Sequence, residues 1–158
     1  MKTAIIYATK HGCTEKCAHT LANELNKNAA LINLDTSTDV NLNEFNTIII
    51  GGSIHAGSMN RKIKKFIEKY LDILNTKKTG LFICCMEEGE KAQEQFDNAF
   101  PESLRKNAIT HGYFGGEFNF DKMNFFEKAI IKKIAQTDRN VSKIKVNNIK
   151  DFAQKIAG

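Results

Sequence analysis

The chain lacks tryptophan, has one proline in 158 residues, and contains no glycine/serine-rich, repetitive or low-complexity segment. Because nothing in it resembles a linker or a repeat, we expect a single domain over residues 1–158. No apolar run approaches the ~20 residues that a membrane-spanning helix needs. No charged and apolar leader precedes the first apolar run, so we expect a cytoplasmic protein.

Cysteine and histidine are scarce, with four residues of each, and they are scattered along the sequence. Cys13, Cys17, Cys84 and Cys85 form neither a CxxC pair nor a zinc-type spacing, so no metal site is expected. Adjacent side chains of a strand point to opposite faces, so Cys84 and Cys85 should not pair with each other. Cys13 stands at the start of a predicted helix, which lowers a thiol pKa, whereas Cys17 is predicted to pack inward.

Acidic residues are the minority, 18 against 23 basic ones, and the net charge is +5. The excess lies between Lys122 and Gly158, where nine basic residues face three acidic ones. This basic C-terminal quarter is either a solvated helix face or a docking surface for an acidic partner or an anionic membrane. A second basic stretch, residues 61–65, is interleaved with apolar residues at helical spacing and matches no nucleic-acid-binding module, so no nucleic-acid partner is expected.

Apolar, β-rich runs alternate with helical patterns along the chain. The predicted strands are Thr3–Ala8, Ala30–Asp35, Thr47–Gly52, Gly80–Cys85 and Ile109–Phe114. Helical spacing predicts one helix from Thr14, one from about Asn60 to Leu74, one within Lys91–Lys106 and one within Ile149–Ile156. Continuous apolar runs indicate strands that are covered on both faces, as in parallel sheets. The sequence therefore predicts a doubly wound α/β fold.

The segment from Glu117 to Asn148 is longer than a connection between a strand and a helix requires. Within it, apolar residues recur at helical spacing and predict an inserted amphipathic helix before the last helix. The stripe consists of Met123, Phe126, Ile130 and Ile134. Two interpretations stay open for this helix: it packs on the domain's own core, or it faces a membrane or a partner.

Residues 9–14, here called loop 1, join the first predicted strand to the first predicted helix. A buried strand that leads through a short Thr/Gly loop into a helix is typical of a phosphate-binding site. The first turn of such a helix offers unpaired N–H groups and the positive end of its dipole, and threonine hydroxyls add donors. Gly12 allows the backbone to close around a phosphate oxygen. We therefore expect a phosphorylated small molecule as ligand.

Two further loops follow the third and fourth predicted strands: residues 51–57, here called loop 2, and residues 85–89, called loop 3. In an open parallel sheet, ligands lie at the carboxyl ends of the strands, near the point where the strand order reverses. The three loops therefore suit a mononucleotide that carries a planar ring.

Loop 1 together with Gly52-Ser53-Ile54-His55-Ala56-Gly57 resembles the flavodoxin-domain family. The similarity covers nearly the full chain, and it is greatest to the quinone-linked protoporphyrinogen dehydrogenase branch, whose insertion has the aromatic-then-basic character of residues 118–133. The resemblance implies a flavodoxin-like five-stranded parallel sheet in the order 2-1-3-4-5, with helices on both faces. It also implies an FMN cofactor.

The resemblance assigns site residues to all three loops. The expected phosphate-side residues are Thr9, Lys10, His11, Gly12, Cys13 and Thr14. The expected residues along one side of the isoalloxazine ring are Ser53, Ile54, His55, Ala56 and Gly57. Met86 and Glu87 would lie at the pyrimidine end or on the other face of the ring. A backbone carbonyl within residues 55–57 is the candidate acceptor for the flavin N5 proton. Gly57 would let the peptide there rearrange more easily.

No side chain is expected to be a catalytic nucleophile, because a flavin carries electrons and hydride itself. His55 is either a proton donor beside the ring or a group that stacks or bonds to backbone. Loops 2 and 3 contain no Tyr or Phe, so the aromatic sandwich of carrier flavodoxins is absent or supplied from elsewhere, for example by the insertion.

Three functions remain open from the sequence. One is an enzyme that oxidises protoporphyrinogen with a quinone acceptor, and another is a one-electron carrier between redox partner proteins, without a substrate of its own. The third is an interaction module that has lost its cofactor.

Overall fold

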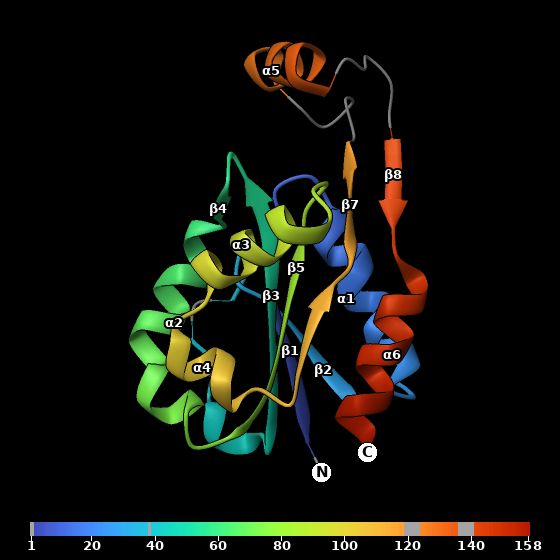
Figure 1. The fold of residues 1–158 in the computed structure, drawn as a ribbon. Coiled ribbons are helices and arrows are strands. Elements are labelled where there is room, and N and C mark those ends of the chain that lie inside the picture. The colour runs from blue at the N-terminus through green and yellow to red at the C-terminus, as the bar shows by residue number, and fades with distance from the viewer. Residues whose placement is uncertain (1, 38, 119–123, 136–140) are drawn as a thin grey trace.

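A five-stranded parallel sheet forms the centre of the computed structural model, which describes residues 2–37, 39–118, 124–135 and 141–158 (Figure 1). Its strands lie in the order β2-β1-β3-β5-β6, which is 2-1-3-4-5 when the parallel strands are counted along the chain. The predicted strand order is therefore confirmed. The strands are β1 (Thr3–Ala8), β2 (Ala29–Asn33), β3 (Thr47–His55), β5 (Lys78–Cys84) and β6 (Thr110–Tyr113).

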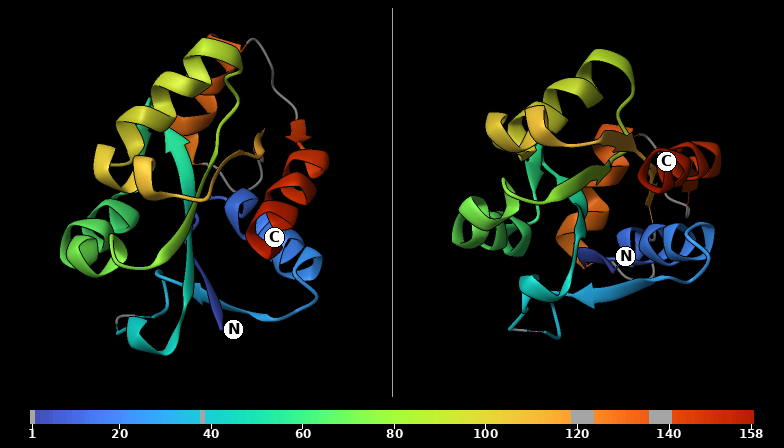
Figure 2. Two further views of the ribbon diagram at one scale, coloured as in Figure 1. Left: turned by 60° about the horizontal axis from the view of Figure 1, so that its bottom comes forward. Right: turned by 90° about the horizontal axis from the view of Figure 1, so that it is seen from below.

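Helices cover both faces of the sheet (Figure 2). On one face lie α1 (Cys13–Glu24) and α6 (Val146–Ala157), and on the other α2 (Arg61–Leu74), α3 (Gly89–Ala99) and α4 (Glu102–Asn107). Alternate residues of one strand enter the two cores, since Ile5 packs with α1 and α6 while Ile6 packs with α2 and α3. This double burial is the physical reason for the continuous apolar runs in the sequence. The turn η1 (Leu42–Glu44) precedes β3.

Two details of the predicted elements are wrong. The helix expected within Lys91–Lys106 is two helices, α3 and α4, separated at Phe100 and Pro101. Proline disfavours helical geometry in the preceding residue, and Phe100 is accordingly extended, with φ −125° and ψ 140°. The third strand does not end at Gly52, because β3 continues to His55 and pairs antiparallel with β4 (Ser58–Met59). Most of loop 2 is thus strand.

The insertion contains a hairpin that the sequence did not predict. β7 (Gly115–Phe118) pairs antiparallel with β8 (Val141–Ile144), and α5 (Phe125–Ala135) lies beyond the carboxyl edge of the main sheet (Figure 1). At Gly115 the backbone takes φ +78°, and a Cβ there would lie 2.0 Å from the Lys143 carbonyl oxygen. Only glycine fits such a close approach, so this residue fixes where the chain leaves the main sheet.

The predicted amphipathic helix exists as α5, and of its two open interpretations, packing on the domain's own core does not hold for Phe126 and Ile130. Their exposed fractions are 76% and 55%, and that of the neighbouring Phe125 is 80%. Met123 and the side chain of Ile134, which complete the predicted stripe, lie outside the described residues. None of the described helices is long and apolar enough to cross a bilayer.

Candidate functional site

Loop 1 leads into an α1 helix that has no side-chain cap at its start among the described residues. Gly12 is the N-cap and has φ 92°, a left-handed conformation that favours glycine. The loop is held by one internal hydrogen bond, from the Gly12 N–H to Thr9 Oγ1 at 2.9 Å, and by one from outside, in which the Thr9 N–H donates to Asp35 Oδ2 at 3.0 Å. The unpaired N–H groups of the first turn of α1 therefore lie next to a loop whose backbone is held in place.

Three buried polar atoms at this site have no hydrogen-bond partner among the described residues. They are His11 Nδ1 and Thr14 Oγ1 in loop 1 and Ser53 Oγ at the carboxyl end of β3. Thr14 is fully buried, and the other two residues are 9% and 8% exposed. Leaving such a group unpaired costs about 1–3 kcal/mol. Three orphaned atoms on two adjacent loops therefore indicate a polar ligand that supplies the missing partners.

Loop 2 ends in a tight turn beside loop 1. Ala56 and Gly57 have φ values of +50° and +77°, and the flanking His55 and Ser58 pair across the turn. Positive φ at both central positions is the pattern of a type I′ hairpin. The His55 ring meets the His11 ring edge to face at a centroid separation of 5.6 Å. The two loops that the sequence predicted to share a ligand are thus in contact.

The pKa of His55 lies below the ordinary histidine value. Partial desolvation of the ring is the largest cause, and the neighbouring His11 and Lys10 lower the pKa further. His55 is therefore neutral at neutral pH, and in that form one ring nitrogen donates while the other accepts. Such a ring suits a hydrogen bond to a polar ligand or to backbone.

A carboxylate from the insertion contacts loop 1, a contact that the sequence did not predict. Glu127 Oε2 in α5 lies 2.6 Å from His11 Nε2 and 3.1 Å from Lys10 Nζ. Desolvation raises the pKa of Glu127, but the hydrogen bonds from His11 and Lys10 outweigh it and the pKa is lowered. Asn124 caps this end of α5 by accepting from the Glu127 N–H at 2.9 Å. The available signal was this Asn-x-x-Glu pattern at the start of the predicted helix.

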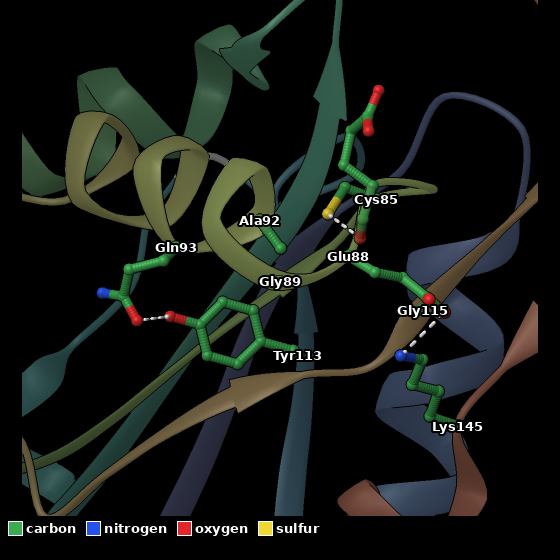
Figure 3. A pocket seen from close by; sticks show the side chains of 9 residues that line it. Cys85, Glu88, Gly89, Ala92, Gln93, Tyr113, Gly115 and Lys145 are labelled. Carbon is green, nitrogen blue, oxygen red and sulfur yellow. Dashed lines mark hydrogen bonds and ion pairs between the residues drawn. The ribbon is translucent and has the colours of Figure 1, made fainter.

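Loop 3 separates into two parts. Met86 is half-buried and packs over β7, where its Sδ would lie 2.7 Å from a Cβ added at Gly116. Glu87 is exposed and borders a cavity of about 210 Å³. Tyr113 of β6 and Gln93 of α3 also line this cavity (Figure 3). Across this cavity the Tyr113 hydroxyl donates to Gln93 at 2.9 Å. Met86 and Glu87 thus both lie on the expected loop, but Met86 packs on β7 and Glu87 borders the cavity.

Three of the cysteine residues, which are scattered along the sequence, lie close together in the folded structure. The Sγ atoms of Cys13, Cys17 and Cys84 all lie within 4.8 Å of one another, and all three residues are buried. The neighbouring thiols of Cys17 and Cys84 lower the pKa of the Cys13 thiol, and Cys13 in turn raises the pKa values of Cys17 and Cys84. Cys85 points to the opposite core, as expected from strand alternation. Local spacing could not reveal the cluster, because it joins residues far apart in the chain.

Comparisons with known proteins place this geometry in a family. A family model described as a flavodoxin domain matches residues 4–144. Oxidised flavodoxin 1 from Bacillus cereus has a TM-score of 0.62 at 15% identity, with 99% of this chain and 97% of that chain covered. Two-electron reduced Megasphaera elsdenii flavodoxin has a TM-score of 0.58 at 15% identity, with 98% of each chain covered.

The same fold also occurs within larger proteins. The Flv1 flavodiiron core from Synechocystis sp. PCC6803 matches 98% of this chain and 34% of its own length, at 19% identity and a TM-score of 0.53. No curated protein sequence matches the chain significantly. Likeness at these identities establishes the fold, and the family match over residues 4–144 establishes the relationship. The chain therefore belongs to the flavodoxin domain family, and membership of that family implies a flavin cofactor.

Proposed function

We propose that this domain binds FMN noncovalently and uses it for redox chemistry. The observation that carries the proposal is the set of orphaned buried atoms, His11 Nδ1, Thr14 Oγ1 and Ser53 Oγ, around an uncapped helix N-terminus. A phosphate accepts hydrogen bonds from the Thr14 hydroxyl, and from His11 Nδ1 when that ring is protonated, and is favoured at this end of the helix dipole. The Ser53 hydroxyl is then left for a polar group on the ring side of the same ligand. The residues present thus fit the phosphate-bearing flavin.

Each loop has a part in this proposal. The first-turn N–H groups of α1 and the Thr14 hydroxyl hold the phosphate, and His11 and Lys10 add positive charge when His11 is protonated. Residues 53–57 would lie along the ring, and a backbone carbonyl within residues 55–57 would accept a hydrogen bond from the N5–H of the reduced flavin. Met86 and Glu87 border the ring from loop 3. Bound FMN supplies one-electron and two-electron transfer, and the protein sets its potential through these hydrogen bonds and charges.

An apolar reaction partner is favoured by α5. Phe125, Phe126 and Ile130 are exposed on this helix, and Glu127 of the same helix contacts loop 1. The apolar side chains therefore stand on the helix that contacts the cofactor loop. We propose that the domain is an enzyme that oxidises a protoporphyrinogen-type substrate with a quinone acceptor. The alternative is a one-electron carrier that uses the same exposed face to dock a redox partner protein.

Cofactor binding tests the first proposal. Purified apoprotein titrated with FMN and with riboflavin should bind FMN at least about 100-fold more tightly, because only FMN carries the phosphate that pairs the orphaned atoms of loop 1. Equal affinity for the two flavins, or binding of neither, would show that loop 1 is not a phosphate site.

Reductive titration and turnover then separate the two functions. The enzyme predicts a single two-electron reduction and oxidation of a porphyrinogen by a soluble quinone at a rate that depends on the loaded protein. The carrier predicts two well-separated one-electron steps and no turnover of the porphyrinogen.

We also propose peripheral contact with an anionic membrane through α5 and the basic C-terminal quarter. The exposed Phe125 and Phe126 share the helix with the exposed Lys132 and Lys133, a combination of apolar and basic side chains that suits an anionic bilayer surface. Sedimentation with anionic vesicles at low salt should be lost in K132E/K133E, and absence of wild-type binding would contradict the idea. A cytoplasmic location belongs to this proposal, because all four cysteines are free thiols, the form kept in a reducing compartment.

A further inference from the structure

Two elements of the main fold bring three thiols together beneath loop 1. Cys13 and Cys17 are one turn apart on the inward side of α1, and Cys84 is the last residue of β5. Their residues are 9%, 0% and 3% exposed. Helix packing and sheet register fix both backbones, since Cys84 pairs with Ser53 in the ladder between β3 and β5. The sulfur atoms are therefore held close together by the fold itself.

Buried cysteines often serve simply as small apolar residues. Here, however, three polarizable sulfur donors converge to within 4.8 Å of one another, and no further His, Asp, Glu or Cys of the described residues joins the group. Three sulfur atoms bound at ~2.3 Å in a trigonal plane would be about 4.0 Å apart. The observed spacing thus lies within a small side-chain adjustment of a three-coordinate metal site.

We propose that Cys13, Cys17 and Cys84 form a trigonal thiolate site for a soft monovalent cation, Cu(I). Thiolate donors select Cu(I) and zinc among biological metals, but a structural zinc site takes four ligands in a tetrahedron. A d10 monovalent ion accepts three sulfur ligands in a trigonal plane, so the three thiolates complete its coordination. Binding replaces the thiol protons, which leave to solvent, and involves no change in oxidation state.

Access and charge at the site agree with this assignment. Cys13 is slightly exposed at the mouth of loop 1, which offers a way in for the ion. The positive end of α1 stabilises the negative charge of the thiolates. Lys16, on the same helix, is held nearby by an ion pair of 2.7 Å with Glu117 of β7. The thiol site shares no side-chain atom with the orphaned groups proposed to bind phosphate, and Cys13 would serve the phosphate through its backbone N–H and the metal through its sulfur.

The test is an anaerobic competition between the full chain and a chromophoric Cu(I) chelator, with and without FMN. Wild-type protein should retain one equivalent of copper, show thiolate-to-copper charge transfer in the ultraviolet, and give three sulfur neighbours by X-ray absorption. Zinc in excess should not displace the copper, because the site lacks a fourth ligand. If the wild-type protein yields all its copper to the chelator, or holds copper through fewer than three sulfurs, the proposal is wrong.

Alanine variants assign the ligands. Cys17→Ala and Cys84→Ala should each weaken Cu(I) binding by at least about 100-fold, because loss of a ligand exceeds the effect of a supporting contact. Cys85→Ala is the matched control, since it removes the neighbouring thiol on the opposite face of the sheet and should bind as the wild type does. Far-UV circular dichroism establishes that each variant is folded. Equal losses of Cu(I) affinity in all three variants, or no loss in any, would overturn the assignment of the ligands. If a variant does not fold, the number of sulfur neighbours in the X-ray absorption spectrum of the wild-type protein tests the assignment instead.

Discussion

Replacing Thr14 by valine should change cofactor affinity and apoprotein stability in opposite directions. Thr14 is fully buried and its Oγ1 has no partner among the described residues. Valine keeps nearly the same shape and removes the unpaired hydroxyl. A buried unsatisfied group costs about 1–3 kcal/mol, so the apoprotein should gain stability of that order. For a chain of this length, 1 kcal/mol corresponds to about 2–4 °C in the melting temperature.

The same substitution should weaken FMN binding. A hydrogen bond to a charged group contributes about 1.5–3 kcal/mol, which converts to a ~10-fold to 150-fold rise in the dissociation constant. Flavin fluorescence quenching measures the affinity, and thermal unfolding of the apoprotein measures the stability. A residue with a purely structural role would not produce a more stable apoprotein that binds its cofactor less tightly.

Thr79 offers a matched control for this experiment. It is also fully buried with an unpaired Oγ1, but it lies near the start of β5, at the opposite edge of the sheet from loop 1. Thr79→Val should therefore stabilise the apoprotein and leave FMN affinity unchanged. The reasoning is refuted if the two valine variants have the same effect on FMN affinity, or if Thr14→Val binds FMN as the wild type does.

Three further outcomes are expected. Glu127→Gln should tighten FMN binding by ~5-fold in a fluorescence titration, because it removes a negative charge close to the phosphate site, worth about 1 kcal/mol in a partly screened environment; weaker binding would contradict this. The pKa of His55 is lowered in the folded protein, so below pH ~6.5 the unfolded chain binds more protons than the folded one, and the free energy of unfolding should fall with pH. By NMR, the titration midpoint of His55 should move to still lower pH in Glu127→Gln, since Glu127 raises the pKa of His55. Gly115→Ala should lower the free energy of unfolding in urea by ~2–4 kcal/mol, since the added Cβ would lie 2.0 Å from a backbone oxygen. Gly57→Ala, at nearly the same φ but with open space around it, should lower it by ~1 kcal/mol or less, and similar losses in the two variants would rule out the clash.

Much of the fold could be predicted from the sequence because parallel strands buried on both faces leave continuous apolar runs. Thr47-Ile48-Ile49-Ile50 is such a run, and it forms the middle of the sheet. The helix break at Pro101 was also readable in principle, because proline constrains its predecessor. The hairpin of β7 and β8 was not, since its strands have four residues each and are separated by α5.

The site was predictable only in its local parts. Loop 1 and the turn at Ala56 and Gly57 carry short-range signals of glycine and threonine next to strand ends. The contact from Glu127 to His11 spans 116 positions, and no spacing rule covers such a distance. The thiol cluster escaped for the same reason: Cys84 joins the two helix cysteines only after β5 has been placed beside β3.

The pairing of α5 with loop 1 has a consequence for how the molecule responds to its surroundings. The Lys10 ammonium and the His11 ring contact the Glu127 carboxylate, and a phosphate bound at loop 1 would compete with that carboxylate for the same two groups. Occupancy of the nucleotide site and detachment of the helix are then thermodynamically linked, and the linkage is reciprocal. Any surface that draws α5 away would raise the affinity for the nucleotide, so recruitment to that surface and loading would reinforce each other.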